Sequence, residues 1–221
     1  MLSLLISLLP VALAGAMSTV PASVTIIILL SPNAHRGALS FLIGSLAGAA
    51  LLVGGAALGL RFLPVRQGAD QNLQLAVVGL VVAACVTGYA VHLLSRPRRT
   101  DSAVLGRLRT RVGSARPWEF LILGTALNLR PKAILLSLTA GALIGLQDLR
   151  LLAGTLVVLG YVLVAQAEIL VPIVLRMRRP EHADAMLTGL DAWMQRHSQT
   201  ITGVTLLLVG LFIAGLSVAR L

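Results

Sequence analysis

The stretch Asn128-Leu129-Arg130-Pro131-Lys132 interrupts an apolar run that is long enough to cross a membrane and extends from about residue 118 to residue 145. A charge at the centre of a bilayer costs on the order of 3 kcal/mol or more, so two cations at this depth need a compensating environment. Proline also removes a backbone hydrogen bond from a helix interior. Because interrupted backbone is tolerated in a membrane only where it is buried in protein or lines a water-filled cavity, the stretch predicts a helix break beside a functional site.

The rest of the chain has the composition of a membrane protein. Of its 221 residues, 57% are hydrophobic and 12% are charged. A transmembrane helix needs about 20 predominantly apolar residues, and six segments qualify: about 2–30, 37–60, 72–94, 118–145, 151–175 and 200–219. Because these segments use most of the chain, we expect an all-α integral membrane protein that forms a single transmembrane domain, 1–221.

Two halves of three spans each would have opposite orientations in the membrane, which is the inverted-repeat architecture of many transporters. We predict repeat one at about 1–94, a basic cytoplasmic loop at 95–117 and repeat two at about 118–221. The first span contains Pro21 and the fourth contains Pro131, each followed by a fresh apolar run. We therefore expect broken helices at both prolines. The alternative is that these are ordinary prolines, which are frequent in membrane helices.

The basic residues predict how the spans are oriented. The loops after spans one, three and five contain twelve arginines, whereas the other loops and the C-terminus contain four. Since basic loops stay in the cytoplasm, we predict a multi-pass protein of the bacterial inner (plasma) membrane with both termini outside the cytoplasm. The net charge of +10 then lies in loops, where it attracts membrane lipids with anionic head groups. We expect no binding of nucleic acid.

A helix that restarts at Pro131 would present free N–H groups and the positive end of its dipole near the centre of the membrane. Arg130 and Lys132 add two charges beside it, and Asn128 adds a hydrogen-bond donor and an acceptor. Together these groups predict a binding site for a phosphate, a sulfate or a carboxylate.

The break expected at Pro21 would bring hydroxyl groups to the same site, and the candidates are Ser18, Thr19, Ser23 and Thr25. The alternative concerns the two cations of the fourth span, which would then have a structural role. They would extend to the lipid head groups or form an ion pair inside the protein.

Glu168 is the only acidic residue well inside a predicted span. Burial favours its neutral form, whereas a nearby cation favours the carboxylate. Glu168 is therefore either a proton carrier coupled to the substrate or a permanent ion-pair partner of Arg130 or Lys132, and the sequence leaves both open. Gln166 is two positions away, on another face of an unbroken helix, so we expect at most one of these two side chains to point into the cavity.

Other classes of function have little support in the sequence. One intramembrane acid is too few for a metal-cation transporter, whose sites need several carboxylates or histidines, and Cys85 is the only cysteine. No HExxH, GxSxG or Walker motif occurs. We predict neither a metal, nor a cofactor, nor an enzymatic activity.

Small residues at four-residue spacing occur in the pairs Gly44–Gly48, Gly55–Gly59 and Gly141–Gly145. Such pairs let helix backbones approach closely, and they would serve packing within the chain or a homodimer. Residues 181–200 have apolar side chains, among them Trp193, at near-helical spacing. They predict a short amphipathic helix on the cytoplasmic membrane surface, which would be a connector, a lid or a lipid anchor.

Six spans, a proline-broken first span, a long basic loop after span three and an Asn-x-x-Pro-Lys-Ala element at residues 128–133 together resemble the lysine exporter (LysE) superfamily. Within it, the chain resembles the actinobacterial peptidoglycolipid addressing protein (GAP, or Sap) family, through Asn128 and residues 131–135 and, more loosely, through Pro21 followed by residues 26–30. This resemblance implies an inner-membrane protein that helps to export cell-envelope glycolipids such as glycopeptidolipids or sulfolipids. The superfamily implies export of amino acids or other small solutes, but residues 19–22 read Thr-Val-Pro-Ala and lack the Pro-Gly-Pro of the amino-acid exporters.

Our leading hypothesis is a secondary transporter or translocase that exports an anionic envelope lipid or glycolipid. The head group would bind between the broken helices, Arg130 and Lys132 would neutralise it, and one three-span half would rock against the other. The first alternative is an amino-acid or small-solute exporter. The second is a non-transporting adaptor that recruits envelope-lipid synthesis or export proteins through residues 95–117 and the helix near Trp193.

Overall fold

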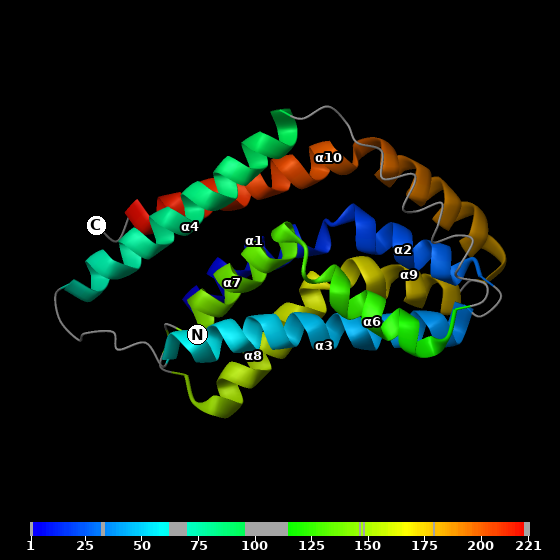
Figure 1. Cartoon of the computed structure of the whole chain (residues 1–221), viewed down its shortest axis with the longest axis horizontal. Coiled ribbons are helices and arrows are strands. Elements are labelled where there is room, and N and C mark those ends of the chain that lie inside the picture. The colour runs from blue at the N-terminus through cyan, green and yellow to red at the C-terminus, as the bar shows by residue number, and fades with distance from the viewer. Residues whose placement is uncertain are drawn as a thin grey trace.

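A computed structural model describes residues 2–31, 34–61, 70–95, 115–145, 147, 149–178 and 180–218. Nearly every residue in these ranges is helical and none is in a strand, which confirms the all-α prediction for this part of the chain (Figure 1). The helices, in chain order, are α1 (Leu2–Ala16), α2 (Thr19–Leu29), α3 (Ala34–Arg61), α4 (Asp70–Ser95), α6 (Pro117–Leu127), α7 (Pro131–Gly145), α8 (Leu151–Ala165), α9 (Ala167–Arg178) and α10 (Pro180–Val218).

One helix on its own, α3, is long and apolar enough to cross a membrane, over Ala34–Gly59. Three further segments pass the same test as bent pairs of helices: α1 with α2, α6 with α7, and α8 with α9, with bends of 51°, 68° and 65°. Helices α4 and α10 contribute shorter apolar stretches, Gly79–Ser95 and Thr200–Gly215. The described helices thus provide up to four membrane-length units, and six full crossings stay a prediction.

The helix breaks differ from the prediction in two respects. In the first span the break falls at Met17 and Ser18, and Pro21 lies in the first turn of α2 rather than at the break. A first turn accommodates proline because the N–H that proline lacks would have no partner there. The fourth span does break beside Pro131, the first residue of α7. The fifth span, expected to be continuous over 151–175, breaks at Gln166.

Helix α3 packs closely against α6 and α7, and glycines on both sides of these contacts allow the backbones to approach. A Cβ on Gly44 would collide with the backbone of Leu121 in α6. A Cβ on Gly145 would lie 2.6 Å from the Ala57 carbonyl oxygen of α3. These glycines therefore serve packing within the chain, one of the two predicted uses, whereas a Cβ on Gly55 would meet nothing within 4 Å.

The other helices form neighbouring pairs. Helix α1 packs on α7 and α8, α2 packs on α9, and α4 packs along α10. Figure 1 shows α4 running along the second half of α10, and α10 also packs on α2. The buried apolar side chains form two clusters, one that includes Val53 and Leu136 and another that includes Phe41 and Phe120. The bent pairs are thereby fixed against one another around α3.

Helix α10 corrects the prediction of a separate short helix over 181–200. It is a continuous helix of 39 residues, Pro180–Val218, because no proline after Pro180 interrupts the run into the last apolar segment. Trp193 is 54% exposed, and its ring contacts that of His197 at a centroid distance of 5.2 Å. The amphipathic segment is therefore continuous with the last apolar helix.

Candidate functional site

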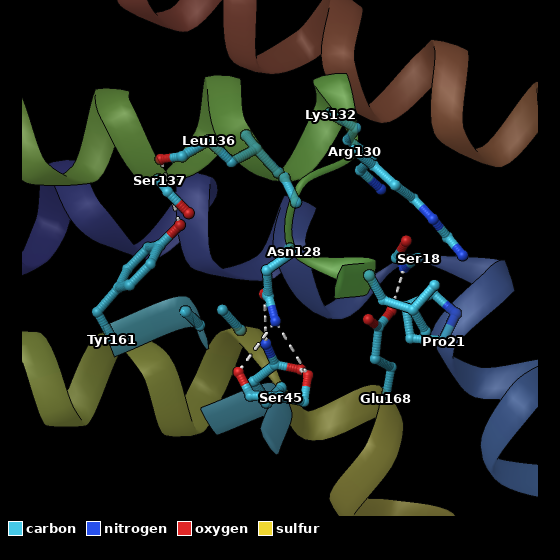
Figure 2. Close-up of a pocket in the computed structure, with 16 residues that line it drawn as sticks. Ser18, Pro21, Ser45, Asn128, Arg130, Lys132, Leu136, Ser137, Tyr161 and Glu168 are labelled. Atoms are coloured by element: carbon cyan, nitrogen blue, oxygen red, sulfur yellow. Dashed lines mark hydrogen bonds between the residues drawn. The ribbon is translucent and has the colours of Figure 1, made fainter. Parts of the chain in front are cut away.

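Three helix breaks meet at one cavity (Figure 2). They are the breaks between α1 and α2, between α6 and α7, and between α8 and α9, and α3 closes one side. The cavity volume is about 60 Å³. Its lining residues are Gly15, Ser18, Pro21, Ser45, Ala49, Leu127, Asn128, Arg130, Lys132, Ala133, Leu136, Ser137, Tyr161, Ala165, Gln166 and Glu168. Since a buried water occupies roughly 10–15 Å³ by this measure, the cavity has room for a few waters or a group of similar size.

The break between α1 and α2 is held by two charged side chains from other helices. The Lys132 ammonium of α7 donates to the carbonyl oxygen of Met17 at 3.1 Å. The backbone N–H of Ser18 donates to Oε2 of Glu168, from α9, at 2.6 Å. A helix end leaves carbonyl or N–H groups without partners, and a cation suits the C-terminal end of a helix as an anion suits the N-terminal end. Lys132 and Glu168 thus compensate both ends of the first break.

A second polar network joins the other two breaks to α3. Asn128 is the C-cap residue of α6 and Gln166 is the C-cap residue of α8, and Gln166 Nε2 donates to Asn128 Oδ1 at 3.2 Å. The Ser45 hydroxyl of α3 donates to Gln166 Oε1 at 3.0 Å. Asn128 Nδ2 donates to the carbonyl oxygens of Gly124 at 3.0 Å and Ser45 at 3.1 Å. Because all three polar side chains are buried, this network fixes the two breaks relative to each other.

The cavity carries more positive than negative charge. Lys132 is buried, with 8% of its surface exposed, and Arg130 and Glu168 are half-buried. The charges of both cations act on the Glu168 carboxylate. Among the described residues that line the cavity, these three are the charged ones, so two cations face one acid. Since hydrogen bonds between a cationic side chain and an anion are stronger than those between neutral groups, this lining suits an anionic group.

Six of the eight predicted site residues line the cavity, namely Pro21, Asn128, Arg130, Lys132, Gln166 and Glu168. The other two do not: Ser23 is buried within α2, and Pro131 is exposed at the start of α7. Of the further hydroxyl residues considered in the first span, only Ser18 lines the cavity, and Thr25 donates to the Pro21 carbonyl oxygen at 2.7 Å within its own helix.

Gln166 and Glu168 both line the cavity, so the prediction that at most one of them would point there is wrong. The prediction assumed an unbroken helix, in which positions two apart face different sides. Instead α8 ends at Ala165 and α9 begins at Ala167, and the two helices differ in direction by 65°. The bend is what brings both side chains to the same cavity.

Sequence reasoning missed three polar residues that line the cavity, Ser45, Ser137 and Tyr161. Each is a polar residue in an apolar run, and that is the signal that could have found it. The signal is weak because many hydroxyl groups in apolar helices bond only to their own backbone. Thr139, for example, donates to the carbonyl oxygen of Leu135 at 2.8 Å.

Metal binding has little support at this site. The part of the chain that the structure describes contains no group of three or more potential metal ligands. The cavity offers one carboxylate, Glu168, beside the cations Arg130 and Lys132, whereas hard metal ions need several oxygen ligands. The chemistry of the lining therefore suits an anion rather than a cation.

Interrupted apolar helices around a buried charged cavity are typical of helical membrane proteins that handle a polar ligand inside the bilayer. A family model described as Sap, sulfolipid-1-addressing protein, matches residues 8–219, and the chain belongs to this family. This confirms the resemblance to the Sap family, and it indicates a role in lipid addressing or export rather than catalysis. Membership of the LysE superfamily stays a prediction. Comparisons with curated proteins and with solved structures gave no match.

Proposed function

We propose that this chain is a membrane translocase that exports an anionic cell-envelope lipid by binding its head group where the three helix breaks meet. The observation that carries this proposal is a cavity bounded by helix ends and lined by Lys132 and Arg130 beside one acid, in a chain that is 57% hydrophobic. The family description supports a sulfolipid, whose sulfate group has the charge that such a cavity favours.

The contact between Glu168 and the start of α2 supports a mechanism of exchange. The Glu168 carboxylate accepts the Ser18 N–H, which is the kind of donor that binds sulfate or phosphate at a helix N-terminus. An incoming anionic group would compete with Glu168 for this N–H and for the two cations. Glu168 is then the counter-ion of the site before the lipid binds, and it becomes a proton carrier if it takes up a proton when it is displaced.

The packing of the helices supports two inverted repeats, one at about 1–94 and one at about 118–221. The α1–α2 unit packs on α8–α9, α3 packs on α6–α7, and α4 packs along α10. Exchanging the two halves leaves these three pairings unchanged, as a two-fold axis between repeats requires, whereas the packing of α10 on α2 has no comparably close counterpart between α4 and α6 or α7 among the described residues. We propose that both repeats form one transmembrane domain and that access alternates by rocking one repeat against the other.

We also propose that the protein lies in the bacterial inner membrane with both termini outside the cytoplasm. The excess of arginines in the loops after spans one, three and five supports this orientation. The adaptor hypothesis rests on two elements. The first, the basic loop, lies outside the described residues over 96–114. In the other element, the helix around Trp193, the Trp193 side chain itself is exposed. A homodimer and contacts with envelope-lipid synthesis proteins stay predictions.

The small volume of the cavity favours a second candidate, an exporter of amino acids or other small solutes. Typical ligand pockets have volumes of roughly 300 Å³ or more, and this cavity of about 60 Å³ encloses no whole glycolipid. Under the lipid hypothesis only the anionic group enters, and the rest of the molecule stays outside the cavity. Export of labelled amino acids by the purified protein in liposomes, without binding of a sulfated lipid, would favour the second candidate.

The test of the proposed function compares Lys132→Met with Lys132→Arg in a host that lacks its own copy of the protein. Both variants lose the original ammonium, but only the second keeps a cation. We expect Lys132→Met to lower the amount of anionic glycolipid at the cell surface at least about tenfold, because a hydrogen bond to a charged group contributes roughly 1.5–3 kcal/mol. Lys132→Arg should retain part of the export.

Two controls make this result interpretable. Arg150→Ala removes an exposed arginine that precedes α8 and does not line the cavity, and it should leave export unchanged. Immunoblotting of membrane fractions should show that all variants accumulate, which separates lost transport from lost folding. Normal export by Lys132→Met at normal abundance would refute a head-group site at this cavity.

A further inference from the structure

An apolar groove follows the charged cavity along the same three helices, α3, α7 and α8. Its volume is about 250 Å³, and it lies between Ala50–Leu58 of α3, Leu151–Leu159 of α8 and the end of α7 at Ile144. Its lining side chains are apolar except for Thr155, whose hydroxyl donates to the Leu151 carbonyl oxygen at 2.9 Å. The groove therefore offers no free polar side chain to a ligand.

The order of residues along the helices shows that the groove continues from the cavity. On α3, Ser45 and Ala49 line the cavity, and Ala50 and Gly54 line the groove. On α8, which runs in the opposite sense, Tyr161 lines the cavity and Val158 lines the groove. The nearest cavity and groove residues are adjacent on α3, Ala49 and Ala50, and lie within one helical turn on α8. The polar and apolar compartments thus lie one after the other, as the head and the tail of a lipid do.

Tyr161 lies between the two compartments. Figure 2 shows it with Leu136 at the end of the cavity opposite Arg130 and Glu168. Its hydroxyl donates to the Leu136 carbonyl oxygen at 3.4 Å, a long hydrogen bond between α8 and α7. The apolar body of the ring is buried and packs in the same core cluster as Val158, so it separates a charged compartment from an apolar one.

We propose that this groove holds an acyl chain of the anionic lipid whose head group enters the charged cavity. The inference rests on the proposed function and adds the position of the tail. An acyl chain needs no hydrogen bonds, and the groove is larger than the roughly 150 Å³ apolar cavity that binds benzene in another protein. Its rim reaches the surface of the protein, since Leu58 and Leu159 are 49% and 47% exposed. A Cβ on Gly54 would meet nothing within 4 Å, so a larger side chain there would occupy space that is open beside the groove.

The test uses a sulfated galactosylceramide with a photoreactive diazirine in the middle of its acyl chain, and the same lipid without the sulfate. The full-length protein is placed in phosphatidylcholine nanodiscs, illuminated and mapped by mass spectrometry. We expect the sulfated lipid to label residues 50–58 and 151–159 more strongly than the uncharged lipid. Gly54→Leu should lower this labelling at least about fivefold by removing van der Waals contacts with the chain.

Gly55→Leu is the matched control, because a Cβ at Gly55 also meets nothing within 4 Å but Gly55 does not line the groove. The inference is overturned if both lipids label these residues equally and Gly54→Leu does not change the labelling. The labelled molecules would then be ordinary surrounding lipid. Unchanged labelling combined with an altered oligomeric state of Gly54→Leu would assign the groove to a second copy of the chain, and would overturn it too.

The outcome for the head-group site can be told apart from the outcome for the groove. If Lys132→Met lowers labelling and Gly54→Leu does not, the proposed function stands and the tail inference fails. If Gly54→Leu lowers labelling and Lys132→Met does not, the groove binds an acyl chain and the head-group site is refuted. Both variants should lower labelling if head and tail bind together.

Discussion

Replacing Gln166 by alanine should loosen the connection between two helix breaks without touching a charged residue. The substitution removes the hydrogen bond that Gln166 donates to Asn128 and the one that it accepts from Ser45. Interhelical hydrogen bonds in membrane proteins contribute about 0.6 kcal/mol on average and up to about 1.7 kcal/mol. For two bonds between buried groups, we expect the free energy of unfolding to fall by about 1–3 kcal/mol.

The assay is reversible unfolding of the purified protein in mixed micelles with increasing sodium dodecyl sulfate, followed by circular dichroism. Gln147→Ala is the control, because Gln147 lies between helices and takes no part in this network; its effect should stay within about 0.5 kcal/mol. A cycle with Asn128→Ala isolates the Gln166–Asn128 bond, and the double variant should lose less stability than the sum of the single variants. Strict additivity would refute the view that these two residues connect the breaks.

Two further variants test the packing and the charge of the site. In Gly141→Val, the Cβ alone would lie 2.8 Å from the Val53 carbonyl oxygen, so the variant should lower the free energy of unfolding by about 1–3 kcal/mol. The control Gly55→Val should be nearly neutral in the same unfolding assay. Glu168→Gln keeps an oxygen that accepts the Ser18 N–H but removes the negative charge; it should accumulate normally and export less glycolipid, with export no longer sensitive to a protonophore. Export by this variant at the original rate and with the original sensitivity would show that the charge of Glu168 has no part in transport.

The sequence alone predicted the features that depend on local chemistry. The break at residues 128–132 was predictable because a proline between two cations leaves few alternatives inside an apolar run. The break at residue 166 was not, because the apolar run continues on both sides and Pro172, the only proline of that span, lies inside α9. The break in the first span was misplaced by a few residues, since proline is accepted within a first turn as well as at its start.

The pairing of polar residues was beyond prediction for a different reason. Ser45 and Gln166 are separated by 121 positions in the chain, and Ser18 and Glu168 by 150. Each of these residues has a plausible local role when it is read singly. Only the packing of α3 and the bent helices decides that they meet, and this packing depends on side-chain volumes summed over many positions.

The contacts at the first break set a condition that any ligand of the cavity must meet. In the structure, Lys132 donates to the Met17 carbonyl oxygen that follows α1, and Glu168 accepts the Ser18 N–H that precedes α2. A ligand changes the state of a protein only by as much as it binds one state better than another. An anionic head group that merely replaced Glu168 at the Ser18 N–H would gain little, because one anion would be exchanged for another. It gains more if it also contacts Arg130 and Lys132 together, because charge-assisted hydrogen bonds to two cations are stronger than the single N–H contact that it takes over from Glu168. Under the proposed function, the second cation is therefore what makes displacement of Glu168 favourable, and Arg130→Ala should impair binding of the lipid more than it impairs folding.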